Sequence, residues 1–248
     1  MVVQVPKSTC VKCICLFNFF KPYLKPEMIS ILDIGSSAGI LLNMFRSNGY
    51  KTYGIEPNES FALYSKKFGH NIEIGTYHEG LFNNEKFDII TMSHVLEHCP
   101  DPIWIISSLK IKLKENGLMA MEVPNVMKPN GPLNGFFQLP HLYTFSKDTF
   151  LKVICLAGFH DILAVDDNYP HLRLLVKNSE VKNCHKYLDN TADYMRVVKS
   201  LRKYQRQYWI CKGPVQILKN SIKAITKKIV GKNIFNQLVS YRYRREIN

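Results

Sequence analysis

The sequence predicts a doubly wound α/β fold built on a mostly parallel, seven-stranded sheet. The composition of the 248 residues, 46% hydrophobic and 21% charged, is typical of a globular protein with a sizeable core. Short apolar runs alternate with segments of helical periodicity along the chain, which is the pattern of β-α-β units. Only a turn separates the last two apolar runs, so we expect them to form an antiparallel hairpin at one edge of the sheet.

The expected strands are short, mainly apolar runs that end at glycine or at polar residues. They cover residues 29–34, 52–55, 71–74, 87–92, 118–123, 162–165 and 172–177. Asn116 and Gly117 predict a turn into the fifth strand. The turn residues at 166–170 separate the last two strands.

The expected helices lie between these strands. They cover residues 38–48, 59–68, 102–113 and 146–157. Gly49, Gly69 and Gly158 follow three of them, as glycine commonly does at a helix C-terminus. Ser146 is suited to be the N-cap of the last helix, which a proline- and glycine-rich loop at 124–142 precedes.

The charge distribution divides the chain. The net charge is +13, and residues 185–248 hold 15 of the 33 Lys and Arg but only 3 of the 20 Asp and Glu. Such a step in composition indicates a boundary. We expect an N-terminal extension at 1–28, an α/β domain at 29–180 and a basic helical tail at 181–248.

The basic tail has three interpretations. Residues 214–232 predict an amphipathic helix, and Lys, Arg, Tyr and Trp are interleaved over 194–209. The apolar stripe can pack on the domain while the lysines stay in water, which we favour. Peripheral contact with an anionic membrane surface comes second. Binding to nucleic acid comes last, because no RNA-binding module is visible.

The N-terminal extension contains an apolar run at 13–20, which is too short to cross a bilayer and lacks a cleavage site of the signal-peptide type. With seven cysteines, an odd number, and no export signal, we expect a cytoplasmic protein. Cys10, Cys13 and Cys15 could bind zinc, but no second pair follows at suitable spacing. We therefore expect ordinary buried or free thiols.

Two glycines and an acid predict a nucleoside site. Gly35 and Gly39 leave the first strand, and Glu56 ends the second. Glycine allows a ligand to approach the backbone, and an acid at that place can accept hydrogen bonds from a ribose. The loop lacks Lys and Arg for binding phosphate, so the pattern favours a nucleoside without phosphate, such as S-adenosylmethionine.

Five sequence blocks together resemble the class I S-adenosylmethionine-dependent methyltransferases, of the kind that modifies polysaccharides and ubiquinone precursors. These blocks are ILDIGSSAG, YGIEPN, FDIITMSHVLEH, LKENGLMAMEVPN and HLYTFSKDTFLKVICLAGF, within residues 29–177. The resemblance implies a Rossmann-like sheet of seven strands, with the last strand inserted antiparallel. It also implies S-adenosylmethionine as the cofactor.

The resemblance further assigns residues to parts of the cofactor. The methionine end would lie among Asp33, Gly35, Ser36 and Gly39, and the ribose on Glu56 with Asn58 nearby; Ser93 and His94 would lie beside the sulfonium. An acidic residue after the third strand often binds the adenine in this family. Here that position falls on Tyr77, His78 or Glu79, and the choice stays open.

Candidate catalytic groups follow the fourth and fifth strands. His94 and His141 could remove a proton from a hydroxyl acceptor. His94, Glu97 and His98 share one face if they are helical, and with His141 they could hold a divalent metal. Ubiquinone-pathway and small-RNA 2′-O-methyltransferases resemble this set but have Glu in place of His94. The alternative is that Glu97 and His98 only orient their loop.

The sequence therefore predicts an S-adenosylmethionine-dependent methyltransferase that acts on a small-molecule or glycan acceptor, most simply on oxygen. One alternative is a metal-assisted RNA 2′-O-methyltransferase. The other is an inactive cofactor-binding protein that interacts through its basic tail.

Overall fold

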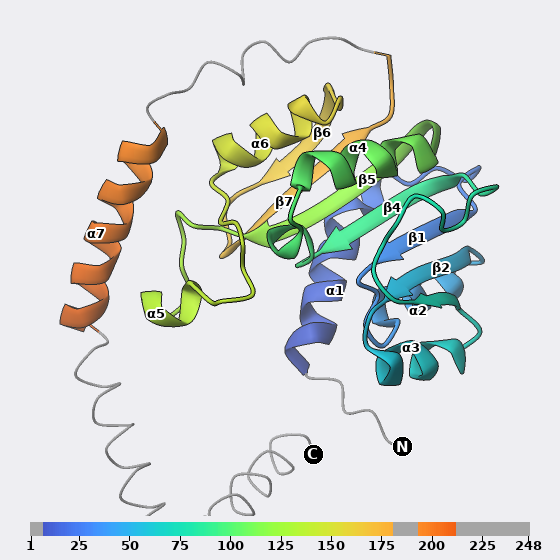
Figure 1. Cartoon of the computed structure of the whole chain (residues 1–248), viewed down its shortest axis with the longest axis horizontal. Coiled ribbons are helices and arrows are strands. Elements are labelled where there is room, and N and C mark those ends of the chain that lie inside the picture. Colours follow the sequence, from blue (N-terminus) through green and yellow to red (C-terminus); the bar gives the residue numbers. More distant parts are fainter. Residues whose placement is uncertain (1–6, 181–192, 212–248) are drawn as a thin grey trace, which may run out of the picture.

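The computed structural model describes residues 7–180 and 193–211, and Figure 1 shows how their elements are arranged. The strands are β1 (Ser30–Ile34), β2 (Lys51–Glu56), β3 (Asn71–Ile74), β4 (Phe87–Ser93), β5 (Leu113–Pro124), β6 (Asp161–Asp166) and β7 (His171–Lys177). The α-helices are α1 (Lys7–Phe20), α2 (Ile40–Arg46), α3 (Glu59–Lys66), α4 (Pro102–Lys112), α5 (Leu133–Phe136), α6 (Lys147–Leu156) and α7 (Asp193–Cys211). Two single-turn 3₁₀ helices are η1 (Lys21–Tyr23) and η2 (Leu96–His98).

The strands form one seven-stranded sheet in the order β3-β2-β1-β4-β5-β7-β6. The first five strands run parallel, while β7 is antiparallel to both β5 and β6. The fold class predicted from the sequence is therefore confirmed, including the terminal hairpin. The order reverses between β1 and β4, and ligands bind at such a switch point in doubly wound sheets.

Helices cover both faces of the sheet (Figure 1), and each face has its own apolar core. One core lies against α4 and α6 and includes Ile106 and Phe150. The other lies against α1, α2 and α3 and includes Phe20, Phe45 and Ala62. Every residue of β1 is buried, because the strand is covered on both faces. The loops at its carboxyl end are thus fixed by a rigid strand.

One local prediction was wrong. The turn expected at Asn116 and Gly117 lies inside β5, which begins at Leu113. Asn116 adopts a positive φ of 60°, and the pairing of β4 with β5 shifts register between Phe87 and Ile89. The two residues therefore form an irregularity within a long strand, because such a bulge uses the same residue types as a turn.

The N-terminal extension contains a helix that the sequence pattern did not predict. Leu16, Phe17 and Phe20 on α1 are buried, and the rings of Phe17 and Phe20 lie 5.3 and 5.7 Å from the ring of Phe45 on α2. Aromatic pairs at these distances are stabilising beyond the area they bury. The extension from residue 7 to 20 is thus packed on the α/β domain.

The described part of the basic tail also packs on the domain. Ser146 Oγ donates a hydrogen bond to Asp193 at 2.5 Å, and the Tyr204 hydroxyl donates to the carbonyl of Gly131 at 2.9 Å. The cations on the rest of α7 are exposed; they are Lys199, Arg202, Lys203 and Arg206. The amphipathic helix expected at 214–232 lies outside the described residues. Among the residues described, no helix has both the length and the apolar character needed to cross a bilayer.

A buried histidine joins α2 to β2 and makes stability depend on pH. His70 Nδ1 lies 2.8 Å from Thr52 Oγ1, and His70 Nε2 lies 2.9 Å from Asn43 Oδ1. Burial and the nearby Arg46 lower the pKa of His70 from 6.5 to about 4. In the unfolded chain, by contrast, the imidazole titrates near its ordinary value.

We expect the folded protein to lose stability as the pH falls from about 6.5 to about 4, because over that range the unfolded chain binds a proton that folded His70 does not. His70→Gln should remove this contribution, which is at most about 3 kcal/mol. Urea unfolding of both proteins at several pH values measures it. Parallel stability curves for the variant and the wild type would contradict the assignment.

Candidate functional site

A cavity of about 720 Å³ opens at the carboxyl ends of β1, β2 and β4, where the strand order reverses. Its walls come from the loops that follow these strands, from the loop after β3 and from the start of α4. The residues used below are Gly35, Glu56, Tyr77, Ser93, His94, His98 and Trp104. This volume is in the range of small-molecule and cofactor sites.

The loop after β1 brings bare backbone to the cavity. Gly35 has a φ of +74°, and its amide donates to the carbonyl of Ile55 at 2.8 Å. A Cβ atom added to Gly35 would lie 2.4 Å from Cγ2 of Val95. Gly39 is equally constrained, because its Cβ would lie 2.3 Å from Ser65 Oγ. Both glycines are therefore required by the shape of the loop.

Gly35→Ala should weaken cofactor binding by at least about tenfold, since both the positive φ and the contact with Val95 oppose a side chain. Gly49→Ala is the matched control, because Gly49 has a φ of +85° and nothing within 4 Å of an added Cβ. The control should lose about 1 kcal/mol of stability and keep its affinity. Equal binding by the two variants, measured by calorimetry, would refute this role of the loop.

Glu56 is positioned by the backbone around it. Its side chain is buried; Oε2 accepts from the amide of Ser37 and Oε1 from the amide of Asn58, both at 2.8 Å. Each carboxylate oxygen keeps a further lone pair. The carboxylate is thus held at the cavity wall and can accept hydrogen bonds from two vicinal hydroxyls. Asn58 itself uses its side chain to cap α3, where Oδ1 accepts from the amide of Phe61.

The far wall of the cavity is apolar and aromatic. Tyr77 and Trp104 have ring centroids 6.2 Å apart and line it with Ile105. Of the three candidates for contact with an adenine, Tyr77 lines the cavity, whereas His78 and Glu79 are not among its lining residues. Such walls suit the flat face of a purine.

A second cavity of about 190 Å³ adjoins the first and shares Gly35, Ser93 and His94 with it. Asp33 and Ser36, which the resemblance assigns to the methionine end of the cofactor, also line it. Asp33 is buried and accepts a hydrogen bond from Thr91 at 2.7 Å. Burial raises the pKa of Asp33 to about 7, although the hydrogen bond opposes this shift.

His94 lies between two buried carboxylates. Its Nε2 is 3.3 Å from Glu122 and its Nδ1 is 3.3 Å from Glu97. Burial would lower the pKa of His94, but the hydrogen bonds to the two acids outweigh burial and raise it. The imidazole is therefore stabilised in its charged form. Of the two histidines predicted to be catalytic, His94 is the one less suited to accept a proton.

Glu122 is itself fully buried and organises this part of the site. It accepts from Ser93 Oγ at 3.0 Å and pairs with Arg173 at 2.6 Å. Desolvation would raise the pKa of Glu122, but His94 and Arg173 together lower it to about 2. No motif in the sequence marks Glu122 or Arg173 as a site residue. The available signal was a charged residue within a buried apolar stretch of each of two strands, Glu122 in β5 and Arg173 in β7.

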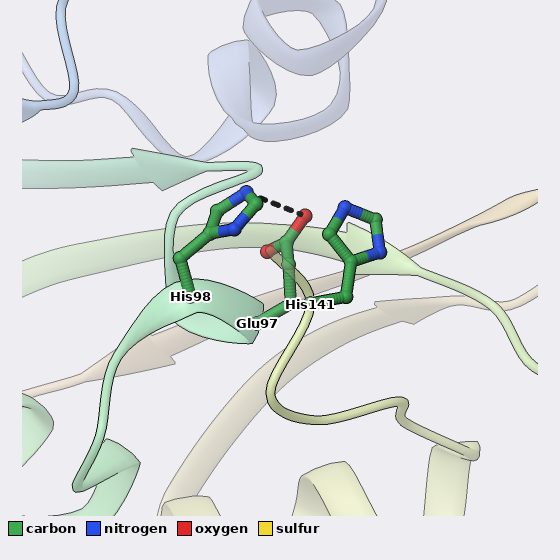
Figure 2. A group of neighbouring side chains, drawn as sticks. All are labelled: Glu97, His98 and His141. Atoms are coloured by element: carbon green, nitrogen blue, oxygen red, sulfur yellow. Dashed lines mark ion pairs between the residues drawn. The ribbon is translucent and has the colours of Figure 1, made fainter. Parts of the chain in front are cut away.

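Figure 2 shows Glu97, His98 and His141 with their side chains directed toward one another, the first two from η2 and the third from the loop before α6. Ligand atoms of all three lie within 4.8 Å of one another. Glu97 Oε2 and His141 Nδ1 are buried and have no hydrogen-bond partner in the described part of the chain. His98 Nδ1 lies 2.8 Å from the carbonyl of Pro140, which fixes the proton on that nitrogen and leaves Nε2 as the acceptor.

This trio fits a divalent cation, because two imidazoles and one carboxylate with unused lone pairs are a common donor set. His94, the fourth predicted ligand, lies outside the group: its nitrogens face Glu97 and Glu122 instead. Without a metal, His141 is still a candidate base. Burial lowers the pKa of His141, so it is neutral at physiological pH.

The cysteines of α1 form no metal cluster among the described residues. Cys10, Cys13 and Cys15 are free thiols, and Cys15 is exposed. Burial raises the pKa of Cys13 to about 12, which keeps it protonated and unreactive.

Comparison with known proteins agrees with the geometry of the site. The chain matches the family model described as a methyltransferase domain over residues 11–164. Ubiquinone biosynthesis O-methyltransferase from Histophilus somni is 36% identical over 106 residues, covering 38% of this chain and 44% of that protein. The match thus spans less than half the length of that curated relative.

Solved structures share the fold. A SAM-dependent methyltransferase from Archaeoglobus fulgidus aligns with a TM-score of 0.55 and 16% identity, covering 69% of this chain and 93% of that one. Magnesium protoporphyrin IX methyltransferase from Synechocystis PCC 6803 with bound SAH aligns with a TM-score of 0.52 and 15% identity, covering 71% and 90%. The family match over residues 11–164, the sheet topology and the cavity at the switch point agree: the chain belongs to the class I S-adenosylmethionine-dependent methyltransferases.

Proposed function

We propose that this enzyme transfers the methyl group of S-adenosylmethionine to a hydroxyl oxygen of a small-molecule acceptor, with a glycan as the second class of acceptor. The observation that carries the proposal is a neutral imidazole, His141, packed beside the cavity. Methyl transfer to a hydroxyl requires alignment with the sulfonium and removal of one proton. The name of the Histophilus somni relative also refers to O-methylation.

The acceptor would approach from the side of His98. This residue lines the cavity, and its ring centroid is 4.9 Å from that of His141. Ser93 and His94 lie at the boundary between the two cavities, where the sulfonium would sit. An acceptor hydroxyl between the sulfonium and the two histidines would have a proton acceptor within reach. The proton would leave to the imidazole as the new carbon–oxygen bond forms and the carbon–sulfur bond breaks.

A divalent metal is a second possibility for the same residues, favoured by the buried, unpartnered atoms of Glu97 and His141. Glu97, His98 and His141 would hold the ion. When bound, it would lower the pKa of an acceptor hydroxyl. Metal analysis of the purified protein, together with activity before and after chelation, separates this arrangement from metal-free base catalysis.

The proposed reaction is tested with labelled S-adenosylmethionine and a panel of phenols, sugar alcohols and free glycans. The expected product carries one added methyl group as an ether, identified by mass spectrometry and by NMR of the methyl carbon. A methyl group found on nitrogen or carbon would refute O-methylation. Cofactor binding without turnover on any acceptor class would instead support the inactive, cofactor-binding alternative.

A further inference from the structure

The smaller cavity is closed by the N-terminal helix. Lys12, Cys13 and Leu16 of α1 line it together with the loop after β1 and the start of α2. It meets the larger cavity at Gly35, Ser93 and His94. A ligand that extends from Glu56 past these residues would therefore end under α1.

The packing of α1 explains why Lys12 faces this space. Lys12, Leu16 and Phe20 are four residues apart and thus lie on one face of the helix. Leu16 and Phe20 are buried in the core beside α2. Because these two residues fix the rotation of the helix, the side chain one turn earlier is directed along the same face into the cavity.

Among the described residues that line either cavity, Lys12 is the one lysine or arginine. It is partly buried, and its Nζ lies 3.4 Å from Nε2 of His94. Within the described residues, no carboxylate forms an ion pair with it. A partly buried cation that lines a cavity and has no counter-charge among the described residues is a site for an anion.

The same cavity contains an acidic side chain, Asp33, whose ionised form an ammonium group would stabilise. Asp33 is buried with one hydrogen bond, from Thr91, and no cationic partner among the described side chains. Ser36 is also buried, and its hydroxyl has no hydrogen-bond partner among the residues that the structure describes. A cation on α1 and a carboxylate on β1 therefore flank one small space. This arrangement complements an amino-acid zwitterion rather than a simple anion.

We propose that Lys12 binds the carboxylate of the amino-acid end of S-adenosylmethionine, opposite Asp33, and that α1 is the wall that closes this end of the cofactor site. The inference depends on the placement of the ribose on Glu56, which directs the amino-acid end toward α1. Lys12 is thus a binding residue for the cofactor, and it has no part in removing the proton from the acceptor.

The test compares two ligands by calorimetry. S-Adenosylhomocysteine has the amino-acid end, whereas 5′-methylthioadenosine has the same adenosine and thioether without it. Lys12→Met should lower the affinity for S-adenosylhomocysteine by about 10- to 100-fold, as expected for the loss of one charge-assisted contact. Its affinity for 5′-methylthioadenosine should not change. Lys12→Arg should retain most of the affinity. Lys25→Met, an exposed position in the same N-terminal segment, is the control for the change in net charge.

Two outcomes would overturn the proposal. Wild-type affinity of Lys12→Met for S-adenosylhomocysteine would show that Lys12 does not contact the carboxylate. An equal loss for both ligands would show that Lys12 only supports the fold of the site. A separate variant tests the placement of the ribose. If that placement were wrong, Glu56→Ala would bind 5′-methylthioadenosine as tightly as the wild type does, whatever the result for Lys12→Met. The two failures are thus distinguishable.

Discussion

Glu56→Ala should weaken the binding of S-adenosylhomocysteine by about 10²- to 10⁴-fold. The carboxylate is buried and fixed by the amides of Ser37 and Asn58, so it meets a ribose without further ordering. Two hydrogen bonds to a charged acceptor contribute about 1.5–3 kcal/mol each. Glu59→Ala, an exposed acid three residues further on, is the matched control and should bind normally.

Loss of affinity alone would not distinguish a ribose contact from a collapsed loop, because the alanine variant also leaves two amides without their acceptor. A double-mutant cycle does distinguish them. The 2′-deoxy analogue of S-adenosylhomocysteine should bind the wild type more weakly than the parent ligand does. It should bind Glu56→Ala as well as the parent ligand does. If the losses of affinity from Glu56→Ala and from the 2′-deoxy ligand were simply additive, the carboxylate would not contact the ribose. Its role would then be limited to holding the backbone amides of the loop.

The sheet could be predicted because its strands are short apolar runs with clear ends. All seven were found, and Ser146 is the N-cap expected from the sequence, with Thr149 completing a capping box. The helix α1 was not predicted. Its apolar residues include exposed ones, Val11 and Ile14, as well as buried ones, so no single apolar face marks the helix. Only the tertiary contact with Phe45 shows which side is packed.

The candidate site was predicted where it depends on local sequence. Gly35 and Glu56 each come directly at the end of an apolar run, so the sequence places them at the carboxyl ends of neighbouring strands. Both line the large cavity. Long-range pairs were out of reach, because Glu122 and Arg173 are 51 residues apart. The same holds for Lys12 and His94, which lie 82 residues apart. A sequence shows that a charge is buried in a strand, but the fold alone shows what neutralises it.

Those buried charges also separate the roles of the histidines. Glu122 and Glu97 hold His94 in its charged form at the boundary between the two cavities. Burial instead keeps His141 neutral. Two imidazoles of one active site are thus adjusted in opposite directions, and only the neutral one can receive a proton at physiological pH. The assignment of the base therefore rests on His141.

His141→Ala should lower kcat by about 10²- to 10⁴-fold, the usual contribution of a general base, and leave the affinity for S-adenosylhomocysteine unchanged. Glu56 and Gly35, the residues proposed to bind the cofactor, lie outside the loop that carries His141. The affinity of the variant for S-adenosylhomocysteine therefore shows whether the cofactor site is intact. His160→Ala, at a partly buried histidine just before β6, should retain full activity. A parallel loss of turnover and cofactor affinity in His141→Ala would exclude an acceptor-side role.

The pH profile and the metal content then decide how His141 acts. As a base, it must be neutral; because its pKa is lowered, wild-type kcat should fall only at a pH below the ordinary titration range of histidine. That decline should vanish in His141→Ala, while the metal content stays the same. As a ligand, His141 would share an ion with Glu97 and His98, so the variant should lose bound metal, and added Mn²⁺ or Zn²⁺ should restore part of kcat. Added metal should therefore raise the kcat of His141→Ala if His141 is a metal ligand, and leave that kcat unchanged if His141 is the base.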